Sequence, residues 1–212
     1  AITERAVVGD AFVSNKYSSF AEMPAGSVLG PSSLRRRAQL LAKRPDLDIR
    51  DLRGNVDTRL HKLDEGQYDA IILAAAGLTR LGYADRIKET LPCDFCIPAV
   101  GQGALAIECR TDNETVRSML EFLNHSATKH CTDAERAFLG LVEGGCQVPI
   151  GVHAEETEAN RMHITAIIAS LDGSTLLRDE IDGCIEDAVA LGKTLGERML
   201  SNGGKEILAK IL

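Results

Sequence analysis

The sequence predicts an open α/β sheet domain followed by a small α+β domain with an antiparallel sheet. Between residues 26 and 78, short apolar stretches alternate with amphipathic stretches of helical period, which is typical of strand and helix units around a parallel sheet. Further on, "MHITAIIASLDGSTLLRDEI" contains two strand-like runs that meet at Asp172-Gly173, a strong hairpin signal. A chain of 212 residues is long enough for two such domains.

Five elements are expected in the first domain. Strands are expected at residues 26–30, 47–54 and 68–78, and helices at residues 32–44 and 57–66. Serine caps open the first helix and Pro45 ends it, because proline cannot continue the backbone hydrogen bonding. Asp57 is the expected N-cap of the second helix, and Gly66 its stop. The run "YDAIILAAAGL" predicts a strand that is buried on both faces.

The last part of the chain has a different pattern. "CTDAERAFLGLVEGG" predicts a helix with Thr132 and Glu135 as a capping box, ended by a double glycine. "EDAVALGKTLGERMLSNGG" predicts an amphipathic helix that stops at Asn202-Gly203-Gly204. Between the two domains, residues 98–124 contain a glycine-rich turn, a predicted strand, and a helix with an apolar face.

Composition and charge limit the class of protein. The longest apolar run, "AIILAAAGL", is much shorter than the roughly 20 residues that span a bilayer, so we expect no membrane partner. Residues 32–62 carry nine Lys and Arg against four Asp, although the whole chain has a net charge of −7. One basic segment in an acidic chain favours a local anion site over a nucleic-acid surface. Six cysteines are too few for a disulfide scaffold, so we expect reduced thiols and a cytoplasmic protein.

The stretch "GPSSLRRR" predicts an anion site. It places a turn and two hydroxyls, Ser32 and Ser33, at the start of a helix, where free backbone N–H groups and the helix dipole favour negative charge. Arg35 and Arg36 lie in the first helical turn, where cations oppose the dipole unless an anion sits beside them. The alternative is a solvated basic helix face with ordinary serine caps.

A second basic stretch, "RDLRGNVDTRL", is expected at the same sheet edge. Arg53 follows the second predicted strand, and Arg59 lies in the first turn of the next helix. Guanidinium groups that converge on one cleft can hold several carboxylates in bidentate fashion. The alternative is that Arg53 pairs with Asp51 or Asp57.

Cys146 stands in the loop "EGGCQVPIG", where neither a helix nor a strand is predicted. The preceding helix presents its negative C-terminal end to the loop, which raises a thiol pKa and disfavours a catalytic nucleophile. Two readings stay open from the residues alone: an attachment point for a covalently held group, and a plain loop cysteine. The pair Cys93 and Cys96 has no second CxxC pair, so we expect no metal site.

Seven motifs taken together resemble the porphobilinogen deaminase family, also called the hydroxymethylbilane synthases. They are "DAFVSNKY", "SSLRRRAQL", "RGNVDTRLHKL", "YDAIILAAAGLTRLG", "PAVGQGALAIECR", "AERAFL" and "EGGCQVPIG". The resemblance covers essentially the whole chain, and the combination of motifs is specific to that family.

The resemblance implies a transferase of tetrapyrrole and heme biosynthesis. Such an enzyme deaminates four porphobilinogen molecules and joins them into the linear tetrapyrrole hydroxymethylbilane on a dipyrromethane cofactor, which a thioether attaches to the cysteine matching Cys146. Its partners are porphobilinogen and the growing polypyrrole chain. The positions matching the family's binding residues for cofactor and substrate carboxylates are Ser32, Ser33, Arg35, Arg36, Arg53, Arg59, Ala74 and Gln102.

The resemblance also implies a periplasmic-binding-protein-like first sheet and a division of the chain into four parts. Residues 1–8 match a hinge, 9–97 the α/β domain with the arginine-lined cleft, 98–124 a segment that returns to another domain, and 125–212 the domain that carries Cys146. About a hundred residues that precede this start in the family have no match here, and they hold the family's catalytic aspartate.

We therefore assign no catalytic residue and expect the 212-residue chain alone to be inactive, although a full-length form would be a monomer. Whether a separate chain supplies the absent segment stays open. The alternative function is a small-anion binding module without chemistry.

Overall fold

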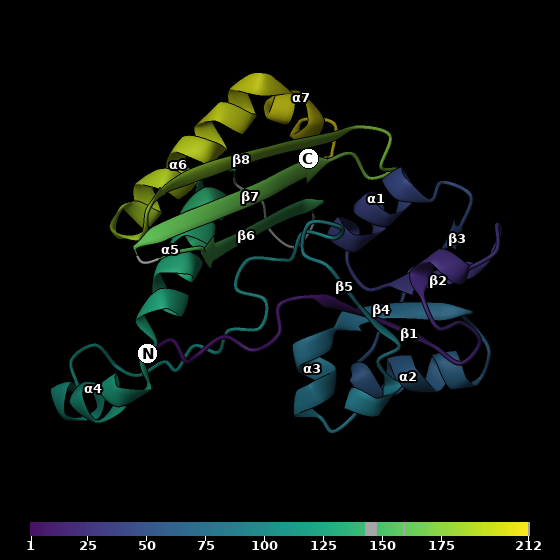
Figure 1. Cartoon of the computed structure of the whole chain (residues 1–212), viewed down its shortest axis with the longest axis horizontal. Helices are drawn as coiled ribbons and strands as arrows, with labels where there is room; N and C mark the ends of the chain where they lie inside the picture. Colours follow the sequence, from purple (N-terminus) through teal and green to yellow (C-terminus); the bar gives the residue numbers. More distant parts are fainter. Residues whose placement is uncertain (143–147, 159, 212) are drawn as a thin grey trace.

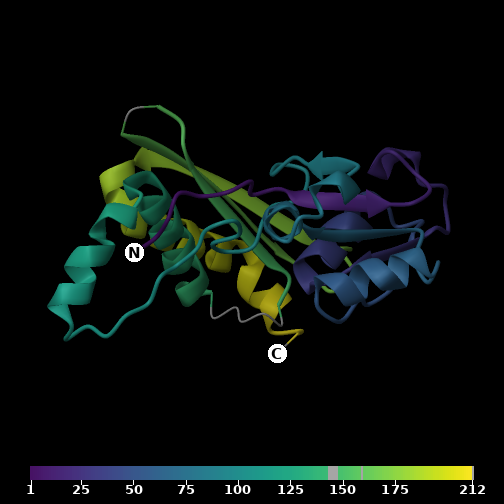
Figure 2. The ribbon, with the colours of Figure 1, turned by 90° about the horizontal axis from the view of Figure 1, so that it is seen from below.

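The computed structural model describes residues 1–142, 148–158 and 160–211. Within these residues the chain forms two units, each built around its own sheet (Figure 1). Viewed from below, the two units lie side by side, and the helix α4 (Glu114–Leu120) projects away from both (Figure 2). No helix among the described residues is long and apolar enough to span a bilayer.

The first unit contains a five-stranded mixed sheet in the order β3-β2-β4-β1-β5. Its strands are β1 (Asp10–Ser14), β2 (Val28–Pro31), β3 (Asp48–Ile49), β4 (Ala70–Ala74) and β5 (Glu89–Leu91). β2 pairs in parallel with β3 and β4, whereas β1 pairs antiparallel with β4 and β5. The predicted open α/β sheet is confirmed, but the sequence patterns did not indicate β1 or β5, and β3 is shorter than expected.

Helices cover both faces of this sheet. The helix α1 (Leu34–Lys43) lies on one face, and α2 (Val56–Asp64) and α3 (Ala75–Arg80) lie on the other (Figure 1). Leu40 of α1 belongs to a buried cluster with Phe12 and Leu29, while Leu60 of α2 packs in a separate cluster with Val13. The alternate residues of β1 and β4 therefore supply two cores, which explains why the three central residues of each strand are apolar.

The long apolar run at residues 68–78 does not form one strand, as the sequence pattern had suggested. β4 ends at Ala74, and the next residue opens α3. A buried strand and a buried helix segment are both continuous apolar runs, so periodicity cannot locate the boundary between them. Alanine has a high helix propensity, which favours the switch in "AAAGL".

The N-cap of α2 also differs from the expectation. Asn55, rather than Asp57, caps the helix, and its side chain accepts a hydrogen bond from the backbone N–H of Thr58 at 2.8 Å. Asp57 lies inside the helix and accepts a hydrogen bond from the Tyr83 hydroxyl. Gly66 follows the end of α2 with a φ of +74°, which confirms it as the stop.

The second unit has a three-stranded antiparallel sheet in the order β6-β7-β8, as the fold class predicted. Its strands are β6 (Ile150–Glu156), β7 (Arg161–Ala169) and β8 (Leu176–Cys184). β7 and β8 form the expected hairpin, and Gly173 in its turn has a φ of +71°. A Cβ atom at Gly173 would clash with the Ala38 carbonyl oxygen of α1, so glycine also lets the two units approach closely.

Two long helices, α5 (Ser126–Leu141) and α6 (Ala188–Met199), cover one face of the second sheet. The predicted capping box in α5 is wrong, because the helix begins earlier with His125 as its N-cap. Thr132 lies inside the helix and donates to the carbonyl oxygen of Thr128. Glu135 is fully buried, and its carboxylate contacts other elements.

The predicted helix end at Asn202-Gly203-Gly204 is confirmed. Asn202 and Gly203 have non-helical backbone angles, with a φ of +110° at Gly203, so the turn Leu200–Gly204 is a kink between α6 and the separate short helix α7 (Lys205–Leu208). The short 3-10 helices of the described chain are Phe20–Glu22, Ala84–Arg86, Glu121–Leu123 and Ile185–Asp187.

The N-terminal segment and the residues after Pro98 run alongside each other between the two units (Figure 1). Thr3 donates its backbone N–H to the carbonyl of Leu105, and Ala6 donates to Gly103. An isolated bridge between Ile2 and Ala106 is the remnant of the strand that the sequence predicted here. Beyond it, Met119 on α4 is 67% exposed, so the apolar face expected for this helix is largely uncovered.

Candidate functional site

A buried ion-pair network lies between α1 and β1. Arg35 and Arg36 extend from the first turn of α1, and Asp10 is the first residue of β1. Arg35 Nη2 donates to Asp10 Oδ2 at 2.9 Å, and Arg36 Nη2 donates to Asp10 Oδ1 at 2.6 Å. The Asp10 side chain is 0% exposed, and those of the two arginines are 5% and 7% exposed.

Gln102 and Ser32 complete the network. Gln102 reaches it from the turn after Pro98, and its Nε2 donates to Asp10 Oδ1 at 2.8 Å. Its Oε1 accepts from Arg35 Nη2 at 3.3 Å. Ser32 Oγ accepts from Arg36 Nη1 at 2.7 Å. Four of the predicted site residues therefore meet in one hydrogen-bonded group, although they come from separate parts of the sequence.

The carboxyl group of Asp10 is held in its charged form. Burial alone would raise the pKa of Asp10, but the guanidinium groups of Arg36 and Arg35 outweigh burial and hold this pKa well below its ordinary value. Burial likewise opposes the charge of Arg35, and Asp10 raises the pKa of Arg35 above its ordinary value. Asp10 and Arg35 therefore stay ionised at neutral pH.

The arginines keep donors that no described residue satisfies. The Nε atoms of Arg35, Arg36 and Arg59 are buried and have no hydrogen-bond partner among the described residues. Burial, followed by repulsion from Arg36, lowers the pKa of Arg59 below its ordinary value. Three guanidinium groups and one carboxylate leave an excess of two positive charges. Buried donors without acceptors are costly, so this group is suited to an anionic ligand.

A hollow of about 330 Å³ opens at the N-terminus of α1, and Ser32 links it to the network. Ser33 lies on its wall and is the N-cap of α1, because its Oγ accepts from the Arg36 backbone N–H. Arg53 also lines the hollow and is exposed. The lining is Pro31, Ser32, Ser33, Leu34, Arg37, Asp51, Leu52 and Arg53.

Ala74 lies opposite Asp10 in the pairing of β1 with β4, so its backbone is close to the arginine group. The alternative ion pairs of Arg53 with Asp51 or Asp57 are not formed in the described structure. Asp51 instead lies 3.6 Å from Arg37.

Asp10 changes the interpretation of the arginines at the start of α1. Their position against the helix dipole was expected to require a bound anion, and Asp10 is one such anion within the chain itself. The sequence contains one signal for this role, because a lone aspartate opens the apolar run "DAFV". An aspartate in a fully buried strand is expected only when it is paired.

A second buried carboxylate, Glu135, ties four segments together. It accepts from Arg5 Nη1 at 2.7 Å and from the backbone N–H groups of Gly101 and Ala154 at 2.6 and 2.9 Å. Burial would raise the pKa of Glu135, but His153, Arg5 and the Ala154 N–H together lower it. Arg5 Nε also donates to the Gln102 carbonyl at 2.9 Å, which connects this group to the Asp10 network.

Cys146 lies outside the described residues. Cys96 is buried beside the network, where its Sγ donates to Asp10 Oδ2 at 3.4 Å, and burial raises the pKa of its thiol to about 12. Among residues 1–142, 148–158 and 160–211, no three His, Cys, Asp or Glu side chains are arranged to hold a metal ion.

Comparison with known proteins gives one consistent result. Residues 1–118 match a family model described as "Porphobilinogen deaminase, dipyromethane cofactor binding domain", and residues 129–201 match "Porphobilinogen deaminase, C-terminal domain". Curated porphobilinogen deaminases from Geotalea uraniireducens and Geobacter sulfurreducens are each 50% identical over 210 residues. The matches cover 99% of this chain, and the chain spans 65% of the length of these relatives.

A solved structure of a lipoprotein from Bacillus subtilis aligns with a TM-score of 0.39 and 10% identity, over 58% of this chain and 60% of that one.

Proposed function

Because the chain belongs to the porphobilinogen deaminase family, we propose that it is the part of a hydroxymethylbilane synthase that holds the dipyrromethane cofactor and the carboxylates of the pyrrole rings. The whole enzyme would deaminate four porphobilinogen molecules and condense them into hydroxymethylbilane. The observation that carries this proposal is the set of three buried guanidinium Nε–H groups, from Arg35, Arg36 and Arg59, that find no acceptor among the described residues.

The residues fit the charge of the proposed ligand. Each pyrrole ring of the cofactor and substrate carries two carboxylates, and the arginine group carries two positive charges in excess. Arg35, Arg36 and Arg59 would bind carboxylate oxygens through their unsatisfied donors, and Ser33 and Arg53 would do so at the hollow beside them. Ala74 would give a close backbone contact, and Gln102 would fix the two arginines through its amide oxygen.

Asp10 acts as a permanent counterion in this proposal. It neutralises part of the arginine charge and holds both guanidinium groups in place before a ligand arrives. Such an arrangement lowers the cost of ordering the side chains on binding. The dipyrromethane, when attached, supplies the free pyrrole end on which the chain of rings is extended. Proton transfer would need the family's catalytic aspartate, which no residue of this sequence matches, so the chain would be inactive without a partner segment.

Removal of Arg59 tests the carboxylate site. We expect Arg59→Met to weaken the binding of porphobilinogen to the purified chain by about 10- to 100-fold, because a charged hydrogen bond in a partly buried site is lost. Isothermal titration calorimetry measures this change. Arg50→Met is the matched control, since Arg50 is exposed and pairs with Asp48, and it should leave the affinity unchanged. Equal affinities for Arg59→Met and the unchanged chain would contradict the proposal.

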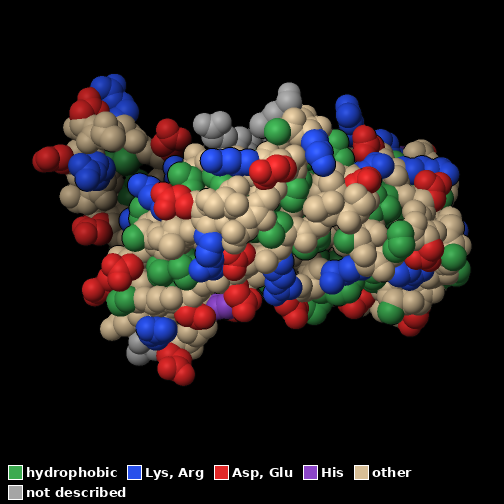
Figure 3. Space-filling model, turned by 90° about the horizontal axis from the view of Figure 1, so that it is seen from above, with side chains coloured by type: hydrophobic (Ala, Val, Ile, Leu, Met, Phe, Trp, Pro, Cys, Tyr) green, Lys and Arg blue, Asp and Glu red, His purple; other side chains and the backbone are tan. Residues whose placement is uncertain are grey.

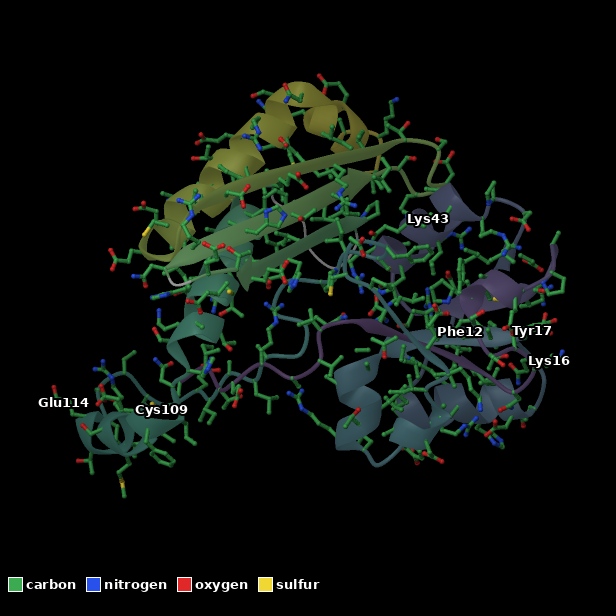
Figure 4. The ribbon with its side chains drawn as sticks, in the orientation of Figure 1. Phe12, Lys16, Tyr17, Lys43, Cys109 and Glu114 are labelled. Atoms are coloured by element: carbon green, nitrogen blue, oxygen red, sulfur yellow. The ribbon has the colours of Figure 1, made fainter. Side chains whose placement is uncertain are left out.

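Mass spectrometry tests the tether and separates the enzyme fragment from a simple anion receptor. We expect the intact chain to carry an adduct of two condensed pyrrole units that Cys146→Ser abolishes. Cys109→Ser is the control, because Cys109 lies on the segment near α4, away from both sheets (Figure 4). A chain that binds porphobilinogen but has an unmodified Cys146 would support a receptor and would reject the tether.

A further inference from the structure

The side chain of Gln39 is buried in the middle of α1, and it belongs neither to the Asp10 ion-pair network nor to the lining of the hollow. It is 2% exposed and lies one turn after Arg35 on the same helix. A glutamine in such a place is unfavourable unless its amide is fully hydrogen-bonded. The partners of this amide therefore indicate what it does.

Gln39 binds both polar groups of a single residue, Ile97. Its Oε1 accepts from the Ile97 backbone N–H at 2.8 Å, and its Nε2 donates to the Ile97 carbonyl oxygen at 3.0 Å. The same carbonyl oxygen accepts from Arg35 Nη1 at 2.5 Å. Gln39 thus fixes the acceptor that orients one side of the Arg35 guanidinium, while Asp10 fixes the other side.

The residues around Ile97 belong to the boundary between the two units. The Pro98 carbonyl accepts from the backbone N–H of Val152 in β6 at 3.0 Å. A Cβ atom at Gly151 would lie 2.8 Å from the Ile97 carbonyl oxygen, so β6 lies directly against this peptide. Figure 1 shows α1 on the side of the first unit that meets the second sheet.

We propose that Gln39 is a positioning residue that holds the Ile97 peptide and thereby sets the orientation of Arg35 in the carboxylate site. It acts through Arg35 and does not touch the ligand. The Ile97 peptide is linked to β6 through Pro98, so the position of Arg35 also depends on the position of the second sheet. The relevance to ligand binding rests on the proposed function, but the mechanical role does not.

Nitrogen-15 NMR of arginine side chains tests the mechanical role directly. In the unchanged chain, blocked rotation should give Arg35 separate Nη signals and a slowly exchanging Nε–H, assigned with Arg35→Lys. Gln39→Met has a similar volume and removes both hydrogen bonds to Ile97, together with a third one from Gln39 Nε2 to the Arg35 carbonyl oxygen at 3.3 Å. In this variant the Arg35 Nη signals should merge and exchange at Nε should rise about tenfold or more. The signals of Arg36 should keep their positions, because Arg36 forms no hydrogen bond with Ile97 in the described structure.

Leu40→Met is the matched control. It places the same side chain at the next position of α1, where Leu40 packs in the sheet core and forms no side-chain hydrogen bond. Unchanged Arg35 signals in folded Gln39→Met would overturn the proposal, as would equal changes in Leu40→Met. If Gln39→Met does not fold, Gln39→Glu replaces it, because one carboxylate oxygen can still accept from the Ile97 N–H. Unchanged Arg35 signals in folded Gln39→Glu, or equal changes in Leu40→Met, would then overturn the proposal.

Calorimetry with porphobilinogen separates this inference from the proposed function. We expect the dissociation constant to rise about tenfold in Gln39→Met and to stay unchanged in Leu40→Met. An unchanged chain that fails to bind porphobilinogen would reject the proposed function, while the NMR comparison would still decide the role of Gln39. Equal affinities of Gln39→Met and the unchanged chain, with altered Arg35 signals, would restrict Gln39 to a structural role and overturn its part in binding.

Discussion

Asp10→Asn is expected to lower the free energy of unfolding by about 3–5 kcal/mol, because it leaves Arg35 and Arg36 buried without their carboxylate. The replacement has nearly the same shape, so no cavity contributes to the loss. Asn also presents an N–H₂ group to donors that need an acceptor, namely Gln102 and Cys96 in addition to the arginines. Urea unfolding followed by circular dichroism measures the change.

The control for Asp10→Asn is an ion pair at the surface. Asp46 pairs with Arg44 at 2.6 Å, but both side chains are accessible to water, so Asp46→Asn should change stability little. A loss in Asp10→Asn no larger than in Asp46→Asn would show that the buried pair contributes nothing net. It would also remove the argument that Asp10 holds the arginines in place.

The contribution of Asp10 has a defined dependence on pH. Its pKa in the folded chain is lowered from an ordinary value of 3.8, so the unfolded chain takes up a proton first as the pH falls. The stabilisation that the Asp10 carboxylate contributes is therefore complete above the ordinary pKa of 3.8, and it is lost as the pH falls through the lower pKa of the folded state. The difference between the unchanged chain and Asp10→Asn should be constant at neutral pH and should shrink only below about pH 4.

Local patterns predicted the parts of the fold that depend on neighbouring residues. Serine capping and a following proline located α1, and Asp172-Gly173 located the hairpin between β7 and β8. The same applies to the site: "SSLRRR" and "RGNVDTR" identified the arginines because their types and order are local features. The positive charge of this segment also indicates an anion site.

The remaining features depend on contacts between distant residues. Asp10 and Arg35 are 25 positions apart, and Glu135 and Arg5 are 130 apart, so no periodicity joins them. The antiparallel position of β1 beside β4 is a property of the whole sheet, and the boundary between β4 and α3 is set by packing on both faces. Glu135 has the spacing of a capping box because a threonine stands three residues before it. The true helix start, at His125, carries a weaker sequence signal.

The two buried carboxylates, Asp10 and Glu135, are the centres of two buried ion-pair groups. On the face shown in Figure 3, acidic and basic side chains are interspersed without a large area of one sign. Inside, Asp10 and Glu135 each pair with arginine. Gln102 connects the two groups, because its backbone carbonyl accepts from Arg5 and its side-chain amide donates to Asp10. A ligand that binds the arginines of the Asp10 network would therefore contact a hydrogen-bonded network that already extends into the second unit.

Glu135→Gln is expected to cost about 3–5 kcal/mol of stability and to loosen one region more than the others. The substitution removes the charge that Arg5 pairs with and replaces one of two oxygens that accept from Arg5, Gly101 and Ala154. Since the pKa of Glu135 is lowered on folding from an ordinary value of 4.5, its contribution is present above that pH and is lost in acid.

Hydrogen exchange distinguishes this loss from general destabilisation. Glu135 anchors the N-terminal segment through Arg5, so exchange should rise first at the amides of Thr3 and Ala6, which donate to Leu105 and Gly103. The amides that pair β1 with β4 do not depend on that anchor and should keep their protection. Asp133→Asn, which removes an exposed pair with Lys129 on the same helix, should cost about 0.5 kcal/mol or less and leave both sets unchanged. Uniform acceleration in Glu135→Gln would mean that its carboxylate supports the whole fold equally, and the link from Arg5 to Gln102 would then have no special role in holding the two units together.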